Sequence, residues 1–287
     1  WRVRTMTSTQ DCVLCSGFAH AVLEKRGIPI YACGSCDHRF ALPPDPDLHV
    51  STVYGIQYFE DGGDGYPDYL QEASMLRQRG RRYAKRVARH APPGSCLDVG
   101  CAAGFTLEGF QSEGWSGTGL EPNNEMAHFG NTQLGLNIIE GTLENTRLPD
   151  KYDLVVLIQV IAHFVNMRLA MENLRSLVAP GGLVLVETWD RSSLTARIFG
   201  KHWHELCPPS VLHWFSRTSL DEMFQQYGFL PVDGGRMVKW ISMRHLTTLG
   251  LHSLSKRAHQ NLINRIPENW KVPYPSEDLF WTLYRLN

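Results

Sequence analysis

The stretch Leu97-Asp98-Val99-Gly100-Cys101-Ala102-Ala103-Gly104 decides the fold of this chain. It joins a short apolar segment, residues 95–99, to a helical pattern over residues 105–114. The turn between them contains only small residues, and small residues let a ligand approach the backbone closely. A strand, a small-residue turn and a helix in this order predict a nucleotide-binding βα unit.

The spacing of the small residues argues against the dinucleotide fingerprint G-x-G-x-x-G. When that pattern starts at Gly100, its second and third glycines fall on Ala102 and Phe105. An acid follows the second expected strand instead, because Glu121 lies 21 residues after Gly100 and is followed by Pro122. A carboxylate at this place accepts the hydroxyls of a ribose in nucleotide-binding sheets. The sequence therefore predicts a nucleoside ligand without a pyrophosphate.

Strand-like and helical patterns alternate regularly after this unit. Such alternation predicts an α/β fold, namely a Rossmann-like doubly wound sheet with helices on both faces. We expect mostly parallel strands and a last, antiparallel strand over residues 279–284. The other expected strands cover residues 116–120, 136–139, 153–157, 183–187 and 229–232, and the expected helices cover 124–134, 167–178 and the region of 220–227.

Composition places the chain among ordinary globular proteins. It has 287 residues, 43% of them apolar and 20% charged, which excludes collagen-like, coiled-coil and wholly disordered chains. The net charge of −1 gives no overall attraction to nucleic acid or an anionic membrane. The longest apolar run, residues 154–164, is shorter than the roughly 18 residues of a membrane span. Residues 1–5 lack the apolar core of a signal peptide, so we leave them out of the expected fold.

Two cysteine pairs near the N-terminus indicate a metal site. Cys12 and Cys15 form one C-x2-C turn, Cys33 and Cys36 form another, and 17 residues separate the two turns. Zinc takes four thiolates in a tetrahedron, which two such turns can supply. Four thiolates leave no coordination position for a substrate, so we expect a structural Zn²⁺ in a small N-terminal zinc ribbon over residues 6–43.

The other cysteines and the nearby histidines carry less information. Cys96, Cys101 and Cys207 are scattered, which does not match a secreted disulfide framework and favours a cytoplasmic location. His20 and His38 are expected at the surface rather than at the metal.

Three segments complete the expected organisation. Residues 44–75 carry seven acids, several aromatic residues and no Lys or Arg, and we expect this linker to lie against the next domain as a lid. Residues 76–90 hold seven Lys or Arg, which either contact RNA or form a solvated helix face. The solvated face is the simpler interpretation because no aromatic stacking motif accompanies it. We expect the cofactor domain over residues 76–235 and a C-terminal cap over 236–287, with a helix at 251–263.

Four motifs in order make the chain similar to class I S-adenosylmethionine-dependent methyltransferases. Besides the turn at 97–104 and the segment 119–122, they are Tyr152-Asp153-Leu154-Val155-Val156 and Leu177-Val178-Ala179-Pro180-Gly181-Gly182. The resemblance covers about residues 76–235. With the zinc ribbon and residues 203–220, the chain resembles a bacterial subgroup that modifies sugars and other small metabolites. The resemblance implies S-adenosyl-L-methionine as cofactor and a small-molecule acceptor, rather than nucleic acid or a membrane, as partner.

The resemblance also implies positions for the cofactor contacts. It implies that Glu121 holds the ribose, that Thr142 and Leu143 border the adenine, and that Gln159 and Val160 lie near the methionine portion. The full set of expected cofactor-binding residues is Asp98, Gly100, Ala102, Gly104, Glu121, Pro122, Thr142, Leu143, Gln159 and Val160.

The chain departs from the family pattern after the fourth strand. Relatives commonly read Asp-x-Leu-Glu-His there, whereas this chain reads Gln159-Val160-Ile161-Ala162-His163, so both acids are lost and the histidine stays. Methyl transfer from a sulfonium needs a base only if the acceptor must lose a proton. His163 is the first candidate base because it leaves the cofactor edge of the sheet, and His202, His204 and His213 are further candidates. Trp189, Tyr58 and Tyr69 are candidates for the lining of the acceptor pocket.

The sequence thus predicts methyl transfer from S-adenosylmethionine to a small molecule, for example a nucleotide-linked sugar or another secondary metabolite. One alternative is an RNA methyltransferase that holds its substrate with the zinc ribbon and the basic helix. A steep fall of affinity with salt would mark that alternative. Another is a non-catalytic cofactor-binding scaffold, which the two missing acids suggest.

Overall fold

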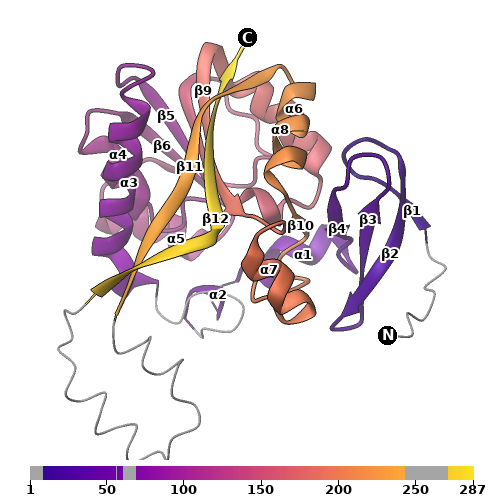
Figure 1. The fold of residues 1–287 in the computed structure, drawn as a ribbon. Helices are drawn as coiled ribbons and strands as arrows, with labels where there is room; N and C mark the ends of the chain where they lie inside the picture. Colours follow the sequence, from indigo (N-terminus) through magenta and orange to yellow (C-terminus); the bar gives the residue numbers. More distant parts are fainter. Residues whose placement is uncertain (1–8, 56, 61–68, 243–270) are drawn as a thin grey trace, which may run out of the picture.

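A seven-stranded sheet forms the centre of the protein (Figure 1). The computed structural model describes residues 9–55, 57–60, 69–242 and 271–287. The strands of this sheet are β5 (Ser95–Val99), β6 (Ser116–Glu121), β7 (Ile138–Glu140), β8 (Tyr152–Ile158), β9 (Val178–Trp189), β11 (Phe229–Ser242) and β12 (Lys271–Leu286).

The order of the strands is that of a doubly wound sheet. It reads β11-β12-β9-β8-β5-β6-β7, so the chain starts in the middle at β5 and winds to each side. The pairs β5–β6, β5–β8, β6–β7 and β8–β9 are parallel, whereas β12 is antiparallel to β9 and β11. The predicted α/β class, the mostly parallel Rossmann-like sheet and its antiparallel last strand are confirmed.

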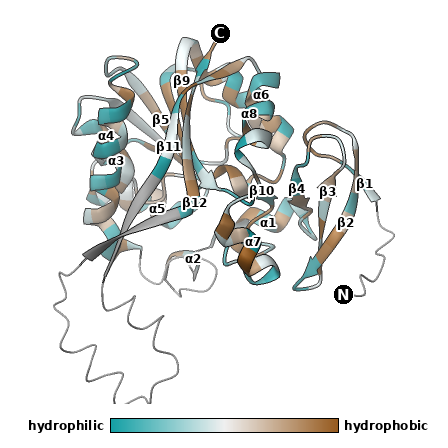
Figure 2. Ribbon diagram, in the orientation of Figure 1, coloured by the Kyte–Doolittle hydropathy of each residue, from teal (hydrophilic) through white to brown (hydrophobic). Residues whose placement is uncertain are grey.

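Helices cover both faces of this sheet. They are α3 (Ala73–Val87), α4 (Phe105–Gln111), α5 (Asn124–Gln133), α6 (Met167–Leu177), α7 (Leu194–Phe199) and α8 (Arg217–Gln226). Figure 1 shows α3 and α4 on one side of the sheet and α6 and α8 on the other. Successive residues of β8 belong to two separate apolar clusters, one on each face of the sheet. Val156 lies in the cluster that contains Phe110 of α4, whereas Val155 lies in the cluster that contains Leu174 of α6. This double burial explains the apolar runs of the central strands, which are brown in Figure 2.

A second sheet of five strands, β1-β2-β3-β4-β10, lies beside the first (Figure 1). Four of its strands come from the N-terminal region, namely β1 (Thr9–Asp11), β2 (Phe18–Lys25), β3 (Ile28–Cys33) and β4 (Arg39–Ala41). The fifth, β10 (His213–Trp214), comes from the segment between α7 and α8 and pairs antiparallel with β4. The N-terminal cysteine module and the larger domain therefore share one sheet.

The acidic linker of residues 44–75 folds partly as short helices. These are α1 (Pro46–Val53), α2 (Gln57–Glu60) and the 3-10 turn η1 (Leu70–Glu72). Phe59 and Tyr69 of this segment are buried, and the Tyr69 ring stacks on Phe105 of α4 with centroids 5.6 Å apart. The linker thus packs against the larger domain. The expected helix at 251–263 lies outside the described residues, and within the described ranges no helix has the length and apolarity needed to cross a membrane.

Candidate active site and metal centre

A cavity of about 430 Å³ opens at the carboxyl ends of β5, β6 and β8. This volume is in the range of ordinary small-molecule sites, and this edge of a doubly wound sheet is where ligands bind. The linker and the segment after β9 close the cavity from other sides. Its lining includes Tyr54, Tyr58, Tyr69, Arg79, Asp98, Gly100, Ala102, Glu121, Pro122, Thr142, Leu143, Glu144, Gln159, Val160, His163, Trp189, His204, Glu205, Cys207 and Ser210.

Glu121 is held in place by the backbone around it. Its Oε2 accepts the N–H of Ala102 at 2.8 Å, and its Oε1 accepts the N–H of Asn123 at 2.8 Å. Ala102 has φ of +48°, a conformation that non-glycine residues seldom adopt and that turns its N–H towards the carboxylate. Each carboxylate oxygen keeps a lone pair for one more donor, so Glu121 can accept ribose hydroxyls without losing its supports.

Asp98 and Gly100 form the floor of the cavity at the end of β5. Asp98 is buried, and its Oδ2 has no hydrogen-bond partner among the described residues, which leaves an acceptor available to a ligand. Gly100 has φ of +65°, and a Cβ at this position would lie 2.6 Å from Cγ2 of Val160. The turn therefore needs glycine both for its backbone conformation and for its closeness to residue 160.

These features fit S-adenosylmethionine. A buried carboxylate can hold the ribose, and an unpaired buried acceptor suits the positive ammonium group of the methionine portion. All but one of the expected cofactor residues line the cavity. The exception is Gly104, which stands at the start of α4 with φ of +86° and shapes the turn. The assignment of each residue to a part of the cofactor stays a prediction.

A buried polar group that the sequence analysis missed lies beside Gln159. Glu187 on β9 is fully buried, and its carboxylate pairs with Arg79 and accepts the hydroxyl of Tyr83 from α3. Gln159 has φ of +58°, and its side-chain Nε2 donates to Glu187 Oε1 at 3.1 Å. Glu187 therefore holds Gln159 in a strained conformation at the cavity. Residue spacing gave no signal for this group because α3 and β9 are distant in the sequence.

His163 lies at the other end of the cavity, in a turn after β8. Its Nδ1 is 2.7 Å from the main-chain oxygen of Ser210 and 3.1 Å from the hydroxyl of Tyr54, which itself donates to that oxygen at 2.7 Å. A carbonyl oxygen can only accept, so Nδ1 carries the proton, and a neutral ring has its lone pair on Nε2. Burial lowers the pKa of His163, whereas the carbonyls of Ser210 and Gln159 act in the opposite direction. The ring is therefore neutral at pH 7, as a base requires.

The other three candidate bases differ in position, and His202 is exposed outside the cavity lining. His204 lines the cavity beside Trp189, whose ring centroid is 4.9 Å away, and its Nε2 is 3.3 Å from the carboxylate of Glu205. His213 is buried outside the cavity lining, and its Nε2 and Nδ1 contact Phe164 O and the His38 ring. Among the four candidate bases, His163 and His204 thus line the space where an acceptor can bind.

The four N-terminal cysteines come together as a candidate metal centre. Their sulfur atoms all lie within 4.8 Å of one another, with Cys12 Sγ 3.6 Å from Cys36 Sγ and Cys15 Sγ 3.5 Å from Cys33 Sγ. A tetrahedral zinc with Zn–S bonds of about 2.3 Å needs sulfur atoms about 3.8 Å apart. The backbone N–H of Leu14 also points to Cys12 Sγ at 3.5 Å. The residues present therefore fit a structural zinc ion.

The two histidines near this centre have different surroundings. His20 is exposed on β2, as expected. The expectation of a surface position for His38 is wrong, because its side chain is 0% exposed. Packing against His213 and Phe215 from the larger domain buries it, and a strand pairing between distant segments cannot be seen in the local sequence.

The metal centre gives a direct prediction for Cys33→Ser. The purified wild-type chain should carry one zinc ion, whereas the variant should carry almost none because a hydroxyl is a poor substitute for a thiolate. The ribbon should lose stability with the metal, since metal binding contributes folding free energy there. Elemental analysis measures the zinc, and the exposed neighbour Ser35→Ala serves as the control. A wild-type chain without stoichiometric zinc, purified without chelator, would contradict the assignment.

Comparison with known proteins agrees with the cavity's geometry. The family described as a methyltransferase domain matches residues 75–233, which is more than half of the chain. The chain belongs to this methyltransferase family. It is an S-adenosylmethionine-dependent methyltransferase, and the predicted family and enzyme class are confirmed.

Curated relatives carry the name ubiquinone biosynthesis O-methyltransferase. The relative from Photorhabdus laumondii is 25% identical over an alignment of 170 residues, which covers 52% of this chain and 67% of the relative. The relative from Rickettsia typhi is 30% identical over 130 residues, which are 44% of this chain and 51% of the relative. The chain thus spans about half to two thirds of the length of these relatives.

Solved structures of methyltransferases share the fold. A Burkholderia thailandensis 1,6-didemethyltoxoflavin-N1-methyltransferase, with its substrate and S-adenosylhomocysteine bound, has a TM-score of 0.55 and 12% identity, covering 93% of this chain and 99% of that one. A Thermotoga maritima methyltransferase has a TM-score of 0.50 and 18% identity, covering 76% of this chain and 93% of that one. At these identities the likeness concerns the fold.

Asp98 and Glu121, the two buried carboxyls at the cofactor edge of the sheet, should make the stability of the methyltransferase depend on pH. Burial, with the charge of Glu121 second, raises the pKa of Asp98 to about 8, and burial raises the pKa of Glu121 to about 7 against two lowering backbone hydrogen bonds. In the unfolded chain both pKa values return to about 4. The folded chain therefore keeps protons that the unfolded chain has released. The contribution of these two carboxyls to the free energy of unfolding is complete below about pH 4. It is lost as the pH rises through their folded-state pKa values of about 7 and 8.

Thermal denaturation without cofactor can measure this effect. Between pH 6 and pH 8 the melting temperature of the wild-type chain should fall more steeply than that of Glu121→Gln, because glutamine does not titrate. Equal slopes for the two proteins would show that Glu121 is already ionised at pH 6.

Proposed function

We propose that this methyltransferase methylates an oxygen or nitrogen atom of a small, planar, uncharged molecule, with His163 as the general base. The observation that carries the proposal is the orientation of His163, whose proton on Nδ1 is held by Ser210 O while its ring lines the cavity. The neutral ring can accept a proton at Nε2.

Aromatic side chains support a planar acceptor. Tyr54, Tyr58 and Trp189 line the end of the cavity that contains His163 and His204. Tyr54 stands edge-on to Tyr58 and to His163, with ring centroids 5.3 Å and 5.5 Å apart. Aromatic walls of this kind bind flat apolar molecules through stacking and edge contacts.

The charges of the cavity disfavour an acceptor with phosphate groups, such as a nucleotide-linked sugar. Among the described lining residues Arg79 is the only Lys or Arg, and it is already paired with the buried Glu187. Glu144 and Glu205 add acidic groups to the same cavity. A phosphate would therefore meet carboxylates without a matching cation, which costs binding free energy.

The names of related proteins are compatible with this substrate class. The curated relatives are called ubiquinone biosynthesis O-methyltransferases, and the Burkholderia structure contains bound 1,6-didemethyltoxoflavin. We infer that the acceptor of this chain is likewise a small ring compound.

The basic helix α3 supports a small molecule over RNA. Arg77 pairs with Glu108 of α4 at 2.8 Å, Lys85 lies 3.4 Å from Glu113, and Arg79 pairs with Glu187. These basic side chains form ion pairs within the domain, which is expected of a helix with a structural role. They are correspondingly less available for phosphates of a nucleic acid.

The proposed reaction needs little from the protein beyond alignment and one proton acceptor. S-adenosylmethionine supplies a methyl group whose bond to sulfur breaks, with the electron pair staying on sulfur, as the acceptor atom bonds to the methyl carbon. Glu121 and the small-residue turn orient the nucleoside part. His163 Nε2 takes the proton that the acceptor hydroxyl or ring N–H loses, and releases it to solvent.

A transfer assay with radioactive methyl groups tests the proposal. The purified chain and labelled S-adenosylmethionine are offered a catechol, a hydroxylated quinone, an N–H heteroaromatic, a nucleotide-linked sugar and total RNA. We expect transfer to one of the ring compounds and none to RNA. Labelling of RNA or the nucleotide-linked sugar alone would overturn the proposal, and cofactor binding without transfer to any acceptor would favour the scaffold alternative.

A further inference from the structure

A pair of buried histidines joins the zinc ribbon to the acceptor end of the cavity. His38 follows the expected zinc ligand Cys36 by two residues, and His213 belongs to β10. His38 Nε2 lies 3.1 Å from His213 Nδ1, and the ring centroids are 5.3 Å apart. The other nitrogen of His213, Nε2, lies 2.8 Å from the main-chain oxygen of Phe164, the residue after His163.

The contacts of this pair allow one arrangement of protons for two neutral rings. The oxygen of Phe164 can only accept, so His213 Nε2 carries the hydrogen. Burial lowers the pKa of His213 to about 4, which keeps its ring neutral at pH 7 and leaves a lone pair on Nδ1. His38 must then donate its Nε2–H to that lone pair. His38 thus donates a hydrogen bond to His213, and His213 donates one to the main chain of Phe164, next to His163.

Backbone hydrogen bonds run parallel to this pair. Ala41 at the end of β4 donates its N–H to Leu212 O at 2.8 Å, and Leu212 donates its N–H to Ala162 O at 2.9 Å. The segment 212–213 therefore binds the residues on both sides of His163, namely Ala162 and Phe164. A strand that belongs to the ribbon's sheet thus fixes the turn that carries the proposed base.

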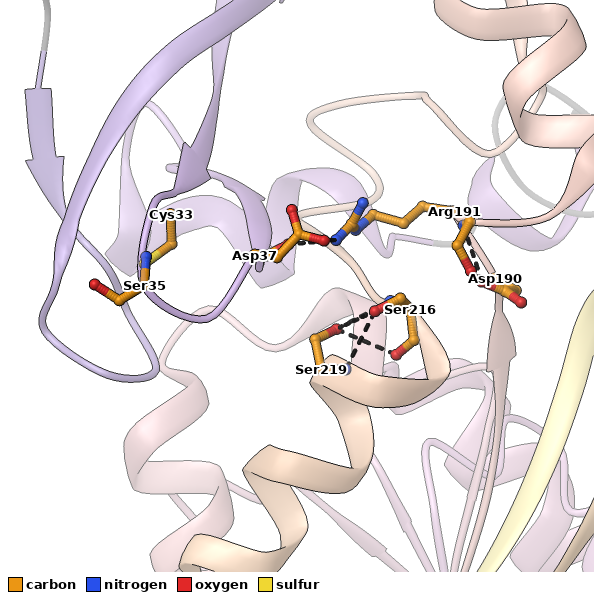
Figure 3. A network of polar contacts seen from close by, with 8 residues as sticks. Cys33, Ser35, Asp37, Asp190, Arg191, Ser216 and Ser219 are labelled. Atoms are coloured by element: carbon orange, nitrogen blue, oxygen red, sulfur yellow. Dashed lines mark hydrogen bonds and ion pairs between the residues drawn. The ribbon is translucent and has the colours of Figure 1, made fainter.

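The turn that carries Cys33 and Cys36 also contacts His38, the residue after Asp37. The N–H of Cys33 donates to the main-chain oxygen of His38 at 2.9 Å, so the turn that holds two expected zinc ligands also holds His38. Figure 3 shows Arg191, which follows β9, reaching across to Asp37, the residue before His38. A change in the conformation of the cysteine turn should therefore move the main chain of His38.

We propose that His38 is a positioning residue of the acceptor site: through His213 it fixes the main chain that carries His163, and so makes the zinc ribbon part of that site. This inference rests on the proposed function, which places the acceptor beside His163. The competing account is that the two histidines only fill space between the domains.

Nitrogen NMR of the full chain with ¹⁵N-labelled histidine, saturated with S-adenosylhomocysteine, tests the proposal without a known acceptor. The variant His38→Phe keeps a ring for packing but removes the donor, and should shift the ring-nitrogen signals of His163. His38→Gln places an amide N–H near the position of Nε2 and should restore them. The same substitution at an exposed site of the ribbon, His20→Phe, should leave them unchanged. His163→Asn assigns the signals.

Removal of zinc by a chelator gives a second measurement that does not depend on a variant folding. The His163 signals of the wild-type chain should shift, while those of His90, which contacts Asp233 on β11 at 2.9 Å, should stay. Unchanged His163 signals in both the metal-free chain and His38→Phe would overturn the proposal. So would equal shifts in His38→Gln and His38→Phe, because packing alone would then explain them.

Binding of S-adenosylhomocysteine, measured by calorimetry on the same samples, separates this proposal from the proposed function. We expect less than a threefold change of affinity in His38→Phe, because Glu121 and Asp98 do not contact the histidine pair. A wild-type chain that fails to bind the nucleoside would contradict the function itself, whatever the NMR signals show.

Discussion

Turnover of His163→Asn should fall by about 10²- to 10⁴-fold on an acceptor that must lose a proton, with S-adenosylhomocysteine affinity nearly unchanged. Asparagine can keep an N–H near the position of Nδ1, where it donates to Ser210 O, but it has no basic nitrogen in place of Nε2. The substitution therefore removes the proton acceptor while leaving the contact that holds the turn.

The pH profile of the wild-type enzyme provides a second readout of His163. Because burial lowers the pKa of this histidine below its usual 6.5, the neutral form should dominate above that value. The rate should therefore rise with pH below pH 6.5 and level off above it, and the His163→Asn variant should lack this rise. The exposed His20→Asn is the matched control. Near wild-type turnover of a folded His163→Asn enzyme between pH 6 and 9 would remove the base from the mechanism.

Glu121→Ala should weaken S-adenosylhomocysteine binding by about 2–3 kcal/mol, or roughly 30- to 150-fold, the scale of charge-assisted hydrogen bonds in a buried site. The substitution also leaves the N–H groups of Ala102 and Asn123 without their acceptor, so the melting temperature should fall.

Calorimetry on the folded variant measures this loss. Glu125→Ala removes an exposed acid in the first turn of α5 and should change the affinity by less than about twofold. NAD should bind to neither protein, because the turn after β5 lacks the second and third glycines of the dinucleotide pattern. An unchanged affinity in Glu121→Ala would place the ribose elsewhere in the cavity.

The features that the sequence predicts correctly depend on local patterns of residues. The strand, turn and helix around Gly100, the acid at Glu121 and the alternation of strands and helices are short-range signals, and the structure contains all of them. The four cysteines come together as expected because each C-x2-C turn is itself local and two turns suffice to enclose a metal.

The parts that the sequence missed depend on contacts between distant segments. The ion pair of Arg79 with Glu187 and the pairing of His38 with His213 join residues more than 100 positions apart, for which periodicity gives no signal. The pairing of β10 with β4 likewise joins two short strands that are distant in the sequence. It buries His38, which the sequence analysis expected at the surface.

Element ends were predicted less well than element types. The helix after the turn ends at Gln111 rather than at residue 114, and β9 extends from Val178 to Trp189, well beyond the predicted 183–187. Ladder hydrogen bonds to β12 and β8 extend β9 on both sides. Strand length therefore reflects the neighbours in the sheet as much as the residues of the strand itself.

A crystal structure of the chain with S-adenosylhomocysteine would show where the ribose, the ammonium group and the sulfur atom bind. We expect the ribose hydroxyls to bind the Glu121 carboxylate and the ammonium group to lie at Asp98. The sulfur atom should face the space between Tyr54, His163 and Trp189. A nucleoside bound away from Glu121, or a sulfur atom directed away from His163, would contradict these expectations.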